Sequence, residues 1–302
     1  MPWRKLGQLY SPRPLHDKLR SHAANPVPLR LNGDVYRVLF NGRDERNRSS
    51  VGWVDIDLNT HDVVAACEAP LCEPGPPGSF FADGISIGNV YEVEGRHYLP
   101  FMGWRNPSGQ HWWGELGRFR VDPGGVLTLD PGTVWFGRSE VDPVSLSYPW
   151  VMALPEGGYR MWYGSTLTWD AGNGEMVHVL RAAASRDGHV FTPEGETVPW
   201  AIGEAQAFSR PTVATLPRGE HRMWFSVRSG AGETYRIGSA RSADLRHWER
   251  IAGDIDVSAT GWDAEMIAYP SVFRHDGRLL MLYNGNGYGA TGFGLAEWVD
   301  AP

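Results

Sequence analysis

The sequence has few cysteines and no concentrated run of basic residues, and each shortage excludes a class of protein. Only Cys67 and Cys72 occur in the 302 residues, too few for a disulfide framework. Their CEAPLC spacing lacks a second pair of metal ligands, so two ordinary thiols is the simplest interpretation and a redox or metal role is the alternative. The net charge is -7 and the sequence contains no cluster of Lys and Arg residues. Because phosphate binding needs a concentrated basic face, we expect no nucleic-acid partner.

Long apolar runs are also absent. No apolar h-region follows MPWRK, and no stretch approaches the length of a membrane span. We therefore expect no membrane partner and a cytoplasmic protein. The 37 glycines, 22 prolines and 14 tryptophans instead indicate short strands punctuated by turns, with large aromatics packed between sheets.

One pattern of strand, turn and aromatic strand recurs along the chain. It appears in SYPWVMALPEGGYRMWYG, SRPTVATLPRGEHRMWFS and AYPSVFRHDGRLLMLYNG, whose aligned residues Pro149, Pro211 and Pro270 are 62 and 59 residues apart. A further copy, NPVPLRLNGDVYRVLFNG, contains Pro26, and its distance to Pro149 is twice that period. The segment ISIGNVYEVEGRHYLPFMGW supplies the missing copy, with Ile87 where the proline would stand.

Each copy continues into a third strand: SVGWVDID, LGRFRV, VLRAAAS, RIGSARS and FGLAEW. In two copies SRDGHVF and SADLRHW indicate the turn into a fourth strand. Four antiparallel strands repeated radially describe a propeller blade. We therefore predict an all-β fold, with residues 1–302 forming a single five-bladed β-propeller domain of four-stranded antiparallel blades. The fifth copy ends at its third strand, so we expect an N-terminal strand at Lys5–Tyr10 to close the last blade.

Several of these segments resemble a known bacterial group. NGRDERNRSSVGWVDID, SRPTV followed by RMWFS, and GWDAEMIAYPSVF followed by LYNGNGYGATGFG are similar to glycosylase-like proteins related to the five-bladed furanosidase and mannoside-phosphorylase propellers. The resemblance implies a carbohydrate substrate and a place in glycan or natural-product biosynthesis. It also implies an Asp as general base at the start of the first blade, where this sequence has SHAANP with His22 and no carboxylate.

The repeat also predicts where a site would lie. In a propeller the starts of the first strands and the ends of the second strands surround one pocket on the axis. Asp142, Glu204 and Asp263 each lie seven residues before an aligned proline, and an acid recurring at one position is as easily structural as functional. Asp83 and Glu265 break the repeat, which favours a role in the pocket.

Two acids facing each other suit glycosidic cleavage, in which one protonates the leaving oxygen and the other activates water. Asp83 and Glu265 belong to the second and fifth copies, which lie across the ring from one another. A separation of about 6.5–9.5 Å would suit inversion. We predict Glu265 as the acid and Asp83 as the base, with Glu204 as a substitute for either. His22 is an alternative base, because an ordinary histidine pKa of about 6.5 suits proton transfer near neutrality, and a structural histidine is the competing interpretation.

Arginines and aromatic residues complete the predicted pocket. Arg43, Arg210 and Arg228 would clamp a carboxylate, a phosphate or a sugar diol, unless they only form ion pairs with Asp44 or Glu204. Trp104, Trp112 and Trp262 are candidate platforms for sugar stacking, with core packing as the alternative. We interpret NGNGYGATGFG, residues 284–294, as a tight hairpin pressed close to the pocket. The predicted substrate-binding residues are Arg43, Asp44, Trp104, Arg210, Arg228, Asp263, Tyr269 and Asn286.

Three functions fit these features. The first is an inverting glycoside hydrolase or phosphorylase acting on a small glycan, with an anionic or nucleotide-linked sugar favoured by the arginines. The second is a non-hydrolytic sugar-modifying enzyme, such as a lyase, cyclase or epimerase, with a site centred on His22 and Tyr269. The third is a non-catalytic sugar-binding propeller with an aromatic pocket and salt-bridged acids. We expect no cofactor and no metal-ligating residue, with an axial Ca²⁺ or another divalent ion and the oligomeric state left open.

Overall fold

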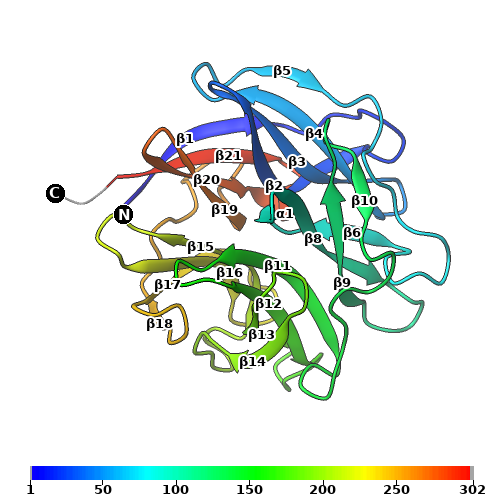
Figure 1. Ribbon diagram of the computed structural model, residues 1–302, viewed down its shortest axis with the longest axis vertical. Helices are drawn as coiled ribbons and strands as arrows, with labels where there is room; N and C mark the ends of the chain where they lie inside the picture. Colours follow the sequence, from blue (N-terminus) through cyan, green and yellow to red (C-terminus); the bar gives the residue numbers. More distant parts are fainter. Residues whose placement is uncertain (1, 300–302) are drawn as a thin grey trace.

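The computed structural model describes residues 2–299, and they form an all-β fold with one short helix (Figure 1). Antiparallel pairing groups the strands into five successive units. The first unit is β2 (Ser21–Asn32), β3 (Val35–Arg43), β4 (Ser49–Asp57) and β5 (Val63–Ala66). The second is β6 (Gly84–Ile87) with β7 (Tyr91–Val93), β8 (Arg96–Arg105), β9 (Trp113–Val121) and β10 (Leu127–Leu129).

The other three units repeat this order along the sequence. The third is β11 (Ser145–Ala153), β12 (Tyr159–Thr168), β13 (Val177–Ser185) and β14 (Thr192–Glu196). The fourth is β15 (Ala207–Thr215), β16 (His221–Arg228), β17 (Arg236–Ser242) and β18 (Glu249–Ile251). The fifth is β19 (Ala268–His275), β20 (Arg278–Asn284), β21 (Phe293–Trp298) and β1 (Trp3–Tyr10).

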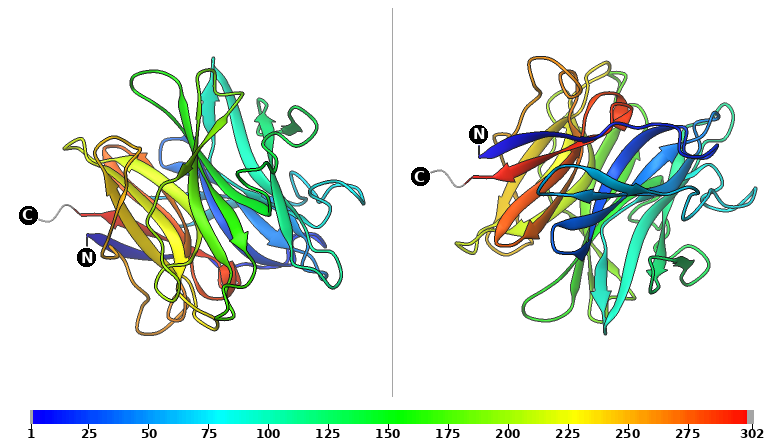
Figure 2. Two further views of the ribbon diagram at one scale, coloured as in Figure 1. Left: turned by 90° about the horizontal axis from the view of Figure 1, so that it is seen from below. Right: turned by 90° about the horizontal axis from the view of Figure 1, so that it is seen from above.

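The units follow one another around a centre. The first strands β2, β6, β11, β15 and β19 each contact the next, and β19 contacts β2. The N-terminal strand β1, blue in Figure 1, lies beside the red β21, and the views in Figure 2 show the same pairing. Their register runs antiparallel from Trp3 opposite Trp298 to Tyr10 opposite Phe293. The predicted N-terminal strand that completes the last unit is therefore confirmed.

The residue before each aligned proline has an unusual backbone. Asn25, Tyr148, Arg210 and Tyr269 all have positive φ, between 42° and 54°, which non-glycine residues adopt rarely. The strand pairing shifts register at each of these positions, as expected of a β-bulge, which re-aims a side chain. Ser86 stands at this place in the second unit, where pairing is regular.

The apolar triplets of the second strands form the core between units, as the sequence predicts. Met161, Trp162, Met223, Trp224 and Met281 are all fully buried. Trp162 packs in one cluster with Met223, and Trp224 packs in another with Met281. Adjacent units therefore share their hydrophobic side chains, so the ring buries apolar surface that a single unit would expose.

The glycine-dense segment after β20 is more structured than the tight hairpin predicted for it. It contains α1 (Asn286–Gly289), in which Gly287 and Tyr288 have left-handed φ of 64° and 58°. Gly287 adopts this conformation without steric cost, whereas Tyr288 is a non-glycine residue, and such residues adopt it rarely. Among residues 2–299 no helix combines the length and the apolar character required to cross a bilayer.

Candidate functional site

A cavity of about 360 Å³ lies where the first strands begin. The polar and charged side chains in its wall are Asn25, Asn41, Arg43, Ser49, Ser86, Asn106, Tyr148, His178, Ser209, Arg228, Tyr235, Tyr269 and Tyr288. The remaining wall residues are Ala24, Met102, Trp104, Trp112 and Met176. No Asp or Glu belongs to the wall formed by the described residues. The cavity is therefore rich in aromatic groups and carries basic but no acidic side chains.

Four tyrosines from four segments meet in this cavity. The rings of Tyr148 and Tyr269 stack with centroids 5.5 Å apart, and Tyr235 lies 6.4 Å from Tyr269 and 6.0 Å from Tyr288. Burial raises the pKa of Tyr148, of Tyr235 and, most strongly, of Tyr269, where the neighbouring tyrosines add to the effect. These phenols are consequently protonated at neutral pH and present hydroxyl groups that can donate hydrogen bonds.

Arg43 is the cavity's unpaired cation. It ends β3, and none of its side-chain atoms takes part in an ion pair or hydrogen bond within residues 2–299. The positive charge of Arg43 acts on the neighbouring phenols, where it lowers the pKa of Tyr148 and of Tyr269 and so partly offsets the rise caused by burial. A half-buried guanidinium without a carboxylate partner is costly to desolvate and is stabilised by any anion that reaches it.

Arg228, the second arginine of the wall, is already neutralised. It ends β16 and its Nε lies 2.6 Å from an oxygen of Glu175, whose side chain is 4% exposed. A second nitrogen donates to the other Glu175 oxygen at 2.9 Å, and the guanidinium lies over the Tyr235 ring at 5.1 Å. This bidentate pair holds Arg228 rigidly against the cavity and leaves Arg43 as the source of uncompensated charge.

His178 is a neutral group in the wall. Its Nε2 shares a hydrogen bond with the Ser147 hydroxyl at 2.7 Å, and its Nδ1 shares one with the Thr166 hydroxyl at 2.6 Å. Complete burial lowers its pKa to about 3. Because both nitrogens have uncharged partners and the pKa is low, the His178 ring does not contribute a positive charge at neutral pH.

Asn25 and Asn41 offer further polar groups. The Asn25 side-chain NH₂ donates to Asn41 Oδ1 at 3.3 Å, and the Asn25 backbone N–H donates to the side chain of Asn284 at 2.9 Å. Asn25 Oδ1 and Asn41 Nδ2 are buried without a hydrogen-bond partner among the described residues. A buried amide atom that lacks a partner costs free energy, so this side of the wall is suited to ligand hydroxyl groups.

The structure places four of the predicted binding residues in the wall, namely Arg43, Trp104, Arg228 and Tyr269. Trp112 lies there as well, whereas Trp262 packs 5.2 Å from the Tyr283 ring outside the wall. Of the four predicted binding residues in the wall, Arg43, Trp104 and Arg228 lie at the ends of second strands. Tyr269 precedes an aligned proline, so all four stand at positions that the repeat singles out.

The predicted carboxylate pair does not meet in this cavity. Asp83 is half-buried and its side chain accepts the backbone N–H of Asn106 at 2.8 Å, which shapes the rim. Glu265 is exposed, and its backbone carbonyl accepts hydrogen bonds from the side chains of Thr234 and Arg236. Neither acid belongs to the wall, so the geometry does not support the predicted acid and base.

Glu204 and His22 also lie outside the wall. The Glu204 side chain is 69% exposed and lies 3.3 Å from Arg250. His22 is bonded to the Ser21 hydroxyl at 2.9 Å, and burial together with the Arg43 charge lowers its pKa to about 4. A base with so low a pKa is poorly matched to proton transfer near neutrality.

Two predicted binding residues are structural carboxylates. Asp44 accepts the backbone N–H groups of Arg46 and Arg48 and pairs with the Arg48 side chain at 2.8 Å, which holds the turn after β3. Asp263 is 2% exposed and lies 2.7 Å from the Lys5 ammonium. It also accepts the Tyr283 hydroxyl at 3.0 Å, so Asp263 links Lys5 of β1 to β20.

Arg210 and Asn286 are likewise structural. Arg210 is buried and donates to the backbone carbonyls of Ile87 and Pro26, so it braces three units across the centre. Burial lowers its pKa. Asn286 Oδ1 accepts the backbone N–H groups of Glu265 and Met266 and holds that loop.

Sequence reasoning missed several wall residues, among them three with aromatic rings that begin or precede a third strand or follow a second strand. His178 is the second residue of β13, Tyr235 directly precedes β17, and Tyr288 lies in α1. Because a third strand runs antiparallel to the second, it begins at the end where the second strand finishes. The starts of the third strands were therefore a usable signal. Tyr288 stands in the glycine-dense segment that was expected near the pocket.

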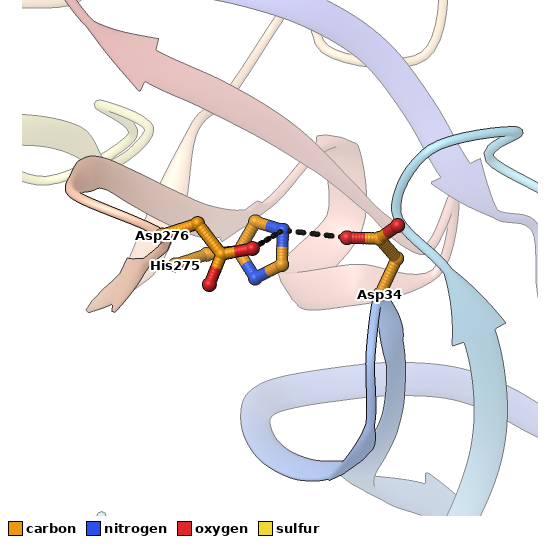
Figure 3. A group of neighbouring side chains, drawn as sticks. All are labelled: Asp34, His275 and Asp276. Carbon is orange, nitrogen blue, oxygen red and sulfur yellow. Dashed lines mark ion pairs between the residues drawn. The ribbon is translucent and has the colours of Figure 1, made fainter.

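One group of possible metal ligands lies away from this cavity. Asp34, His275 and Asp276 have oxygen and nitrogen atoms within 4.8 Å of one another (Figure 3). His275 Nε2 lies 2.9 Å from Asp34 and 3.7 Å from Asp276, while Nδ1 is bonded to the Tyr36 hydroxyl at 3.2 Å. Both ring nitrogens thus have protein partners. We assign the group to joining the turns of the first and fifth units.

The fold is that of propeller-type glycoside hydrolases. The protein BT0996, solved as a complex with RGII, is similar with a TM-score of 0.69 and 14% identity, covering 99% of this chain and 91% of that one. A glycosyl hydrolase from Bacteroides ovatus has a TM-score of 0.68 at 12% identity, with 93% and 85% covered. The endo-arabinase of Bacteroides thetaiotaomicron has a TM-score of 0.60 at 16% identity, with 93% and 95% covered. At such identities the likeness shows the fold alone.

Two sequence relatives come from Mycobacterium tuberculosis. The uncharacterized proteins Rv1502 and MT1551 are each 42% identical to this chain over 301 residues, covering 98% of it and 99% of each relative. This protein belongs to the family of these two relatives. No family model matches the sequence.

Proposed function

We propose that the protein binds a carbohydrate that carries a negatively charged group, in the cavity around Arg43. We interpret the five units as the five blades of one propeller domain, with β6 and β7 together in place of the first strand of the second blade, and with this cavity at the axis. The observation that carries the proposal is the charge balance of the wall. It contains Arg43 without a partner and Arg228 with one, and no acidic side chain among the described residues.

The other wall residues support a sugar as the ligand. Sugar rings present an apolar face and a rim of hydroxyl groups, and sites for such ligands combine aromatic surface with a few placed polar groups. Trp104 and Trp112 supply aromatic surface, and Asn25, Asn41 and Tyr269 supply polar groups. Hydrolysis by Asp83 and Glu265 is not part of the proposal, because neither acid lines the cavity.

The test compares charged sugars with their neutral counterparts by titration calorimetry. Suitable pairs are glucuronate with glucose, galacturonate with galactose, and glucose 6-phosphate with glucose, together with N-acetylneuraminate. We expect a charged member to bind more tightly. Arg43→Gln should weaken that binding about tenfold or more, because a charge-assisted hydrogen bond is lost, and leave the neutral sugar unaffected.

Arg218→Gln is the matched control, since Arg218 is exposed in the turn between β15 and β16, at the end opposite the cavity. Asp83→Asn and Glu265→Gln should also retain binding. Wild-type protein that binds no charged sugar better than its neutral counterpart, or an Arg43→Gln variant with unchanged affinity, would contradict the proposal.

The tyrosine cluster favours a second candidate, a sugar-modifying enzyme such as a lyase, cyclase or epimerase. Tyr148, Tyr235 and Tyr269 keep their protons at neutral pH and lie in a cavity beside Arg43. There a phenol hydroxyl can donate a hydrogen bond to a substrate oxygen that gains negative charge during the reaction. Incubation with the charged sugars that bind, followed by mass spectrometry and NMR, would detect the product. Tyr269→Phe should then abolish turnover while binding persists. Turnover that survives this substitution would exclude Tyr269 as the hydrogen-bond donor that stabilises the reacting oxygen.

A further inference from the structure

A second aromatic cluster adjoins the cavity. The loop between β8 and β9 carries His111 and Trp112, and the loop after β12 in the next unit carries Trp169. The rings of His111 and Trp169 stack with centroids 4.9 Å apart and an angle of 13° between planes. Trp112 meets Trp169 edge-on, also at 4.9 Å. We call His111, Trp112 and Trp169 the aromatic platform.

The platform is continuous with the cavity. Trp112 belongs to the cavity wall and at the same time contacts Trp169. Trp169 is half-buried and His111 is exposed, so the cluster extends from the cavity outward to solvent. Two adjacent units contribute to it, just as several units contribute to the cavity.

Core packing accounts for the platform poorly. Trp169 and His111 belong to none of the hydrophobic core clusters of the described residues, whereas Trp112 packs at the edge of one. The neighbouring Trp113 shows the contrast, because its ring is covered by the guanidinium groups of Arg105 at 3.6 Å and Arg138 at 4.6 Å. Aromatic rings left at the mouth of a pocket are suited to a ligand that extends beyond it.

We propose that the aromatic platform binds a second sugar ring, linked to the charged sugar in the cavity. The ligand is then an acidic glycan of at least two rings, with its charged residue at Arg43 and its neighbour against the platform. This inference rests on the proposed function and adds the size and direction of the ligand. Stacking of a sugar face on an indole needs no charge, so the second ring is recognised by its apolar face.

The test compares one-ring and two-ring forms of the same acid by titration calorimetry. The probes are galacturonate with digalacturonate, and N-acetylneuraminate with the disaccharide sialylgalactose. Wild-type protein should bind one of the two-ring probes about tenfold more tightly than its one-ring form, the size of effect expected of one added aromatic contact. Trp169→Ala should remove this gain and leave one-ring affinity unchanged. His111→Ala should reduce it.

Trp200→Ala is the control, since Trp200 is a half-buried tryptophan outside the cavity wall. His111→Ala keeps the proposal testable if Trp169→Ala fails to fold, because removing an exposed side chain leaves the core intact. Thermal unfolding would show whether each of the two variants is folded. The proposed role of the platform would be wrong if wild-type protein bound no two-ring probe more tightly than its one-ring form. It would also be wrong if the extra affinity for the two-ring probe persisted in both Trp169→Ala and His111→Ala. In either case, binding of the one-ring acids would still support the charged-sugar site in the cavity. Failure of all charged probes would overturn the proposed function, and the platform with it.

Discussion

At the scale of residues, the site is decided by which charges have partners. Glu175 neutralises Arg228 and Lys5 neutralises Asp263, so neither arrangement attracts a charged ligand. Arg43 has no such partner in the described residues, although it is the same residue type as Arg228 at the equivalent end of a second strand. Identical residues at equivalent repeat positions therefore have different chemistry, because their neighbours differ.

His178 leads to a prediction about pH. Its pKa is about 3 in the folded protein and about 6.5 in an unfolded chain, so below pH 6.5 the unfolded state binds a proton that the folded state does not. The stability that it contributes is complete above pH 6.5 and is lost as the pH falls toward 3. Between pH 7 and pH 5 the wild-type protein should lose about 2 kcal/mol more than His178→Gln.

Urea denaturation at several pH values would measure this difference. His178→Gln itself should be less stable at pH 7, because the bonds to Ser147 and Thr166 are altered, but its stability should change less with pH. His97→Gln, a change at an exposed histidine, should keep the wild-type slope. Parallel slopes for wild-type protein and His178→Gln would contradict the prediction.

At the scale of elements, two features recur in the strands. The bulge before each aligned proline directs Asn25, Tyr148 and Tyr269 into the cavity. In the fourth unit it directs Arg210 toward the backbone carbonyls of Ile87 and Pro26. The strand β1 supplies the outermost strand of the fifth unit, which would otherwise leave β21 as an unpaired edge. The last unit therefore depends on residues from the opposite end of the sequence.

Trp3 provides the test of this closing strand. Its side chain is 4% exposed and meets Trp224 at 5.3 Å and Trp298 at 5.2 Å. Trp3→Ala should lower the free energy of unfolding by about 3–5 kcal/mol, as expected for truncating a buried aromatic residue. Chemical denaturation would measure the loss, and Trp200→Ala, at a half-buried position, should cost less. A loss in Trp3→Ala no greater than that in Trp200→Ala would contradict the prediction.

At the scale of the whole molecule, the ring of units has a cavity at one end and a contact between the first and fifth units at the other. The cavity lies where the first strands begin, and the contact of Asp34 with His275 lies at the turns where the first strands of the first and fifth units finish. The first and fifth units are thus linked at one end by the Asp34–His275 contact, and Arg210 links three units at the centre. Cavity residues are free to serve a ligand, since other residues hold the units together.

The net charge of the molecule also gains meaning at this scale. A protein with a charge of -7 would by itself argue against an anionic ligand. The wall of the cavity has the opposite balance, because the acids near it are turned outward or paired. Local arrangement, and not the total, decides which ligand the protein attracts.

The sequence by itself determined the all-β fold, the repeated strands and the buried Met and Trp residues of the second strands. These features depend on local alternation and on a repeat of about sixty residues, both visible along the sequence. It also singled out Arg43, Trp104, Arg228 and Tyr269 through their repeat positions.

Only the tertiary structure decided which polar groups meet. Lys5 and Asp263 are 258 positions apart, and Arg210 reaches the Pro26 carbonyl from a different unit. Whether a carboxylate is structural or functional therefore depends on partners that are distant in sequence. Asp83 and Glu265 illustrate this, because the fold places both of them outside the cavity wall. Such partners depend on the register and the bulges of strands far apart in sequence, which side-chain identity alone does not encode.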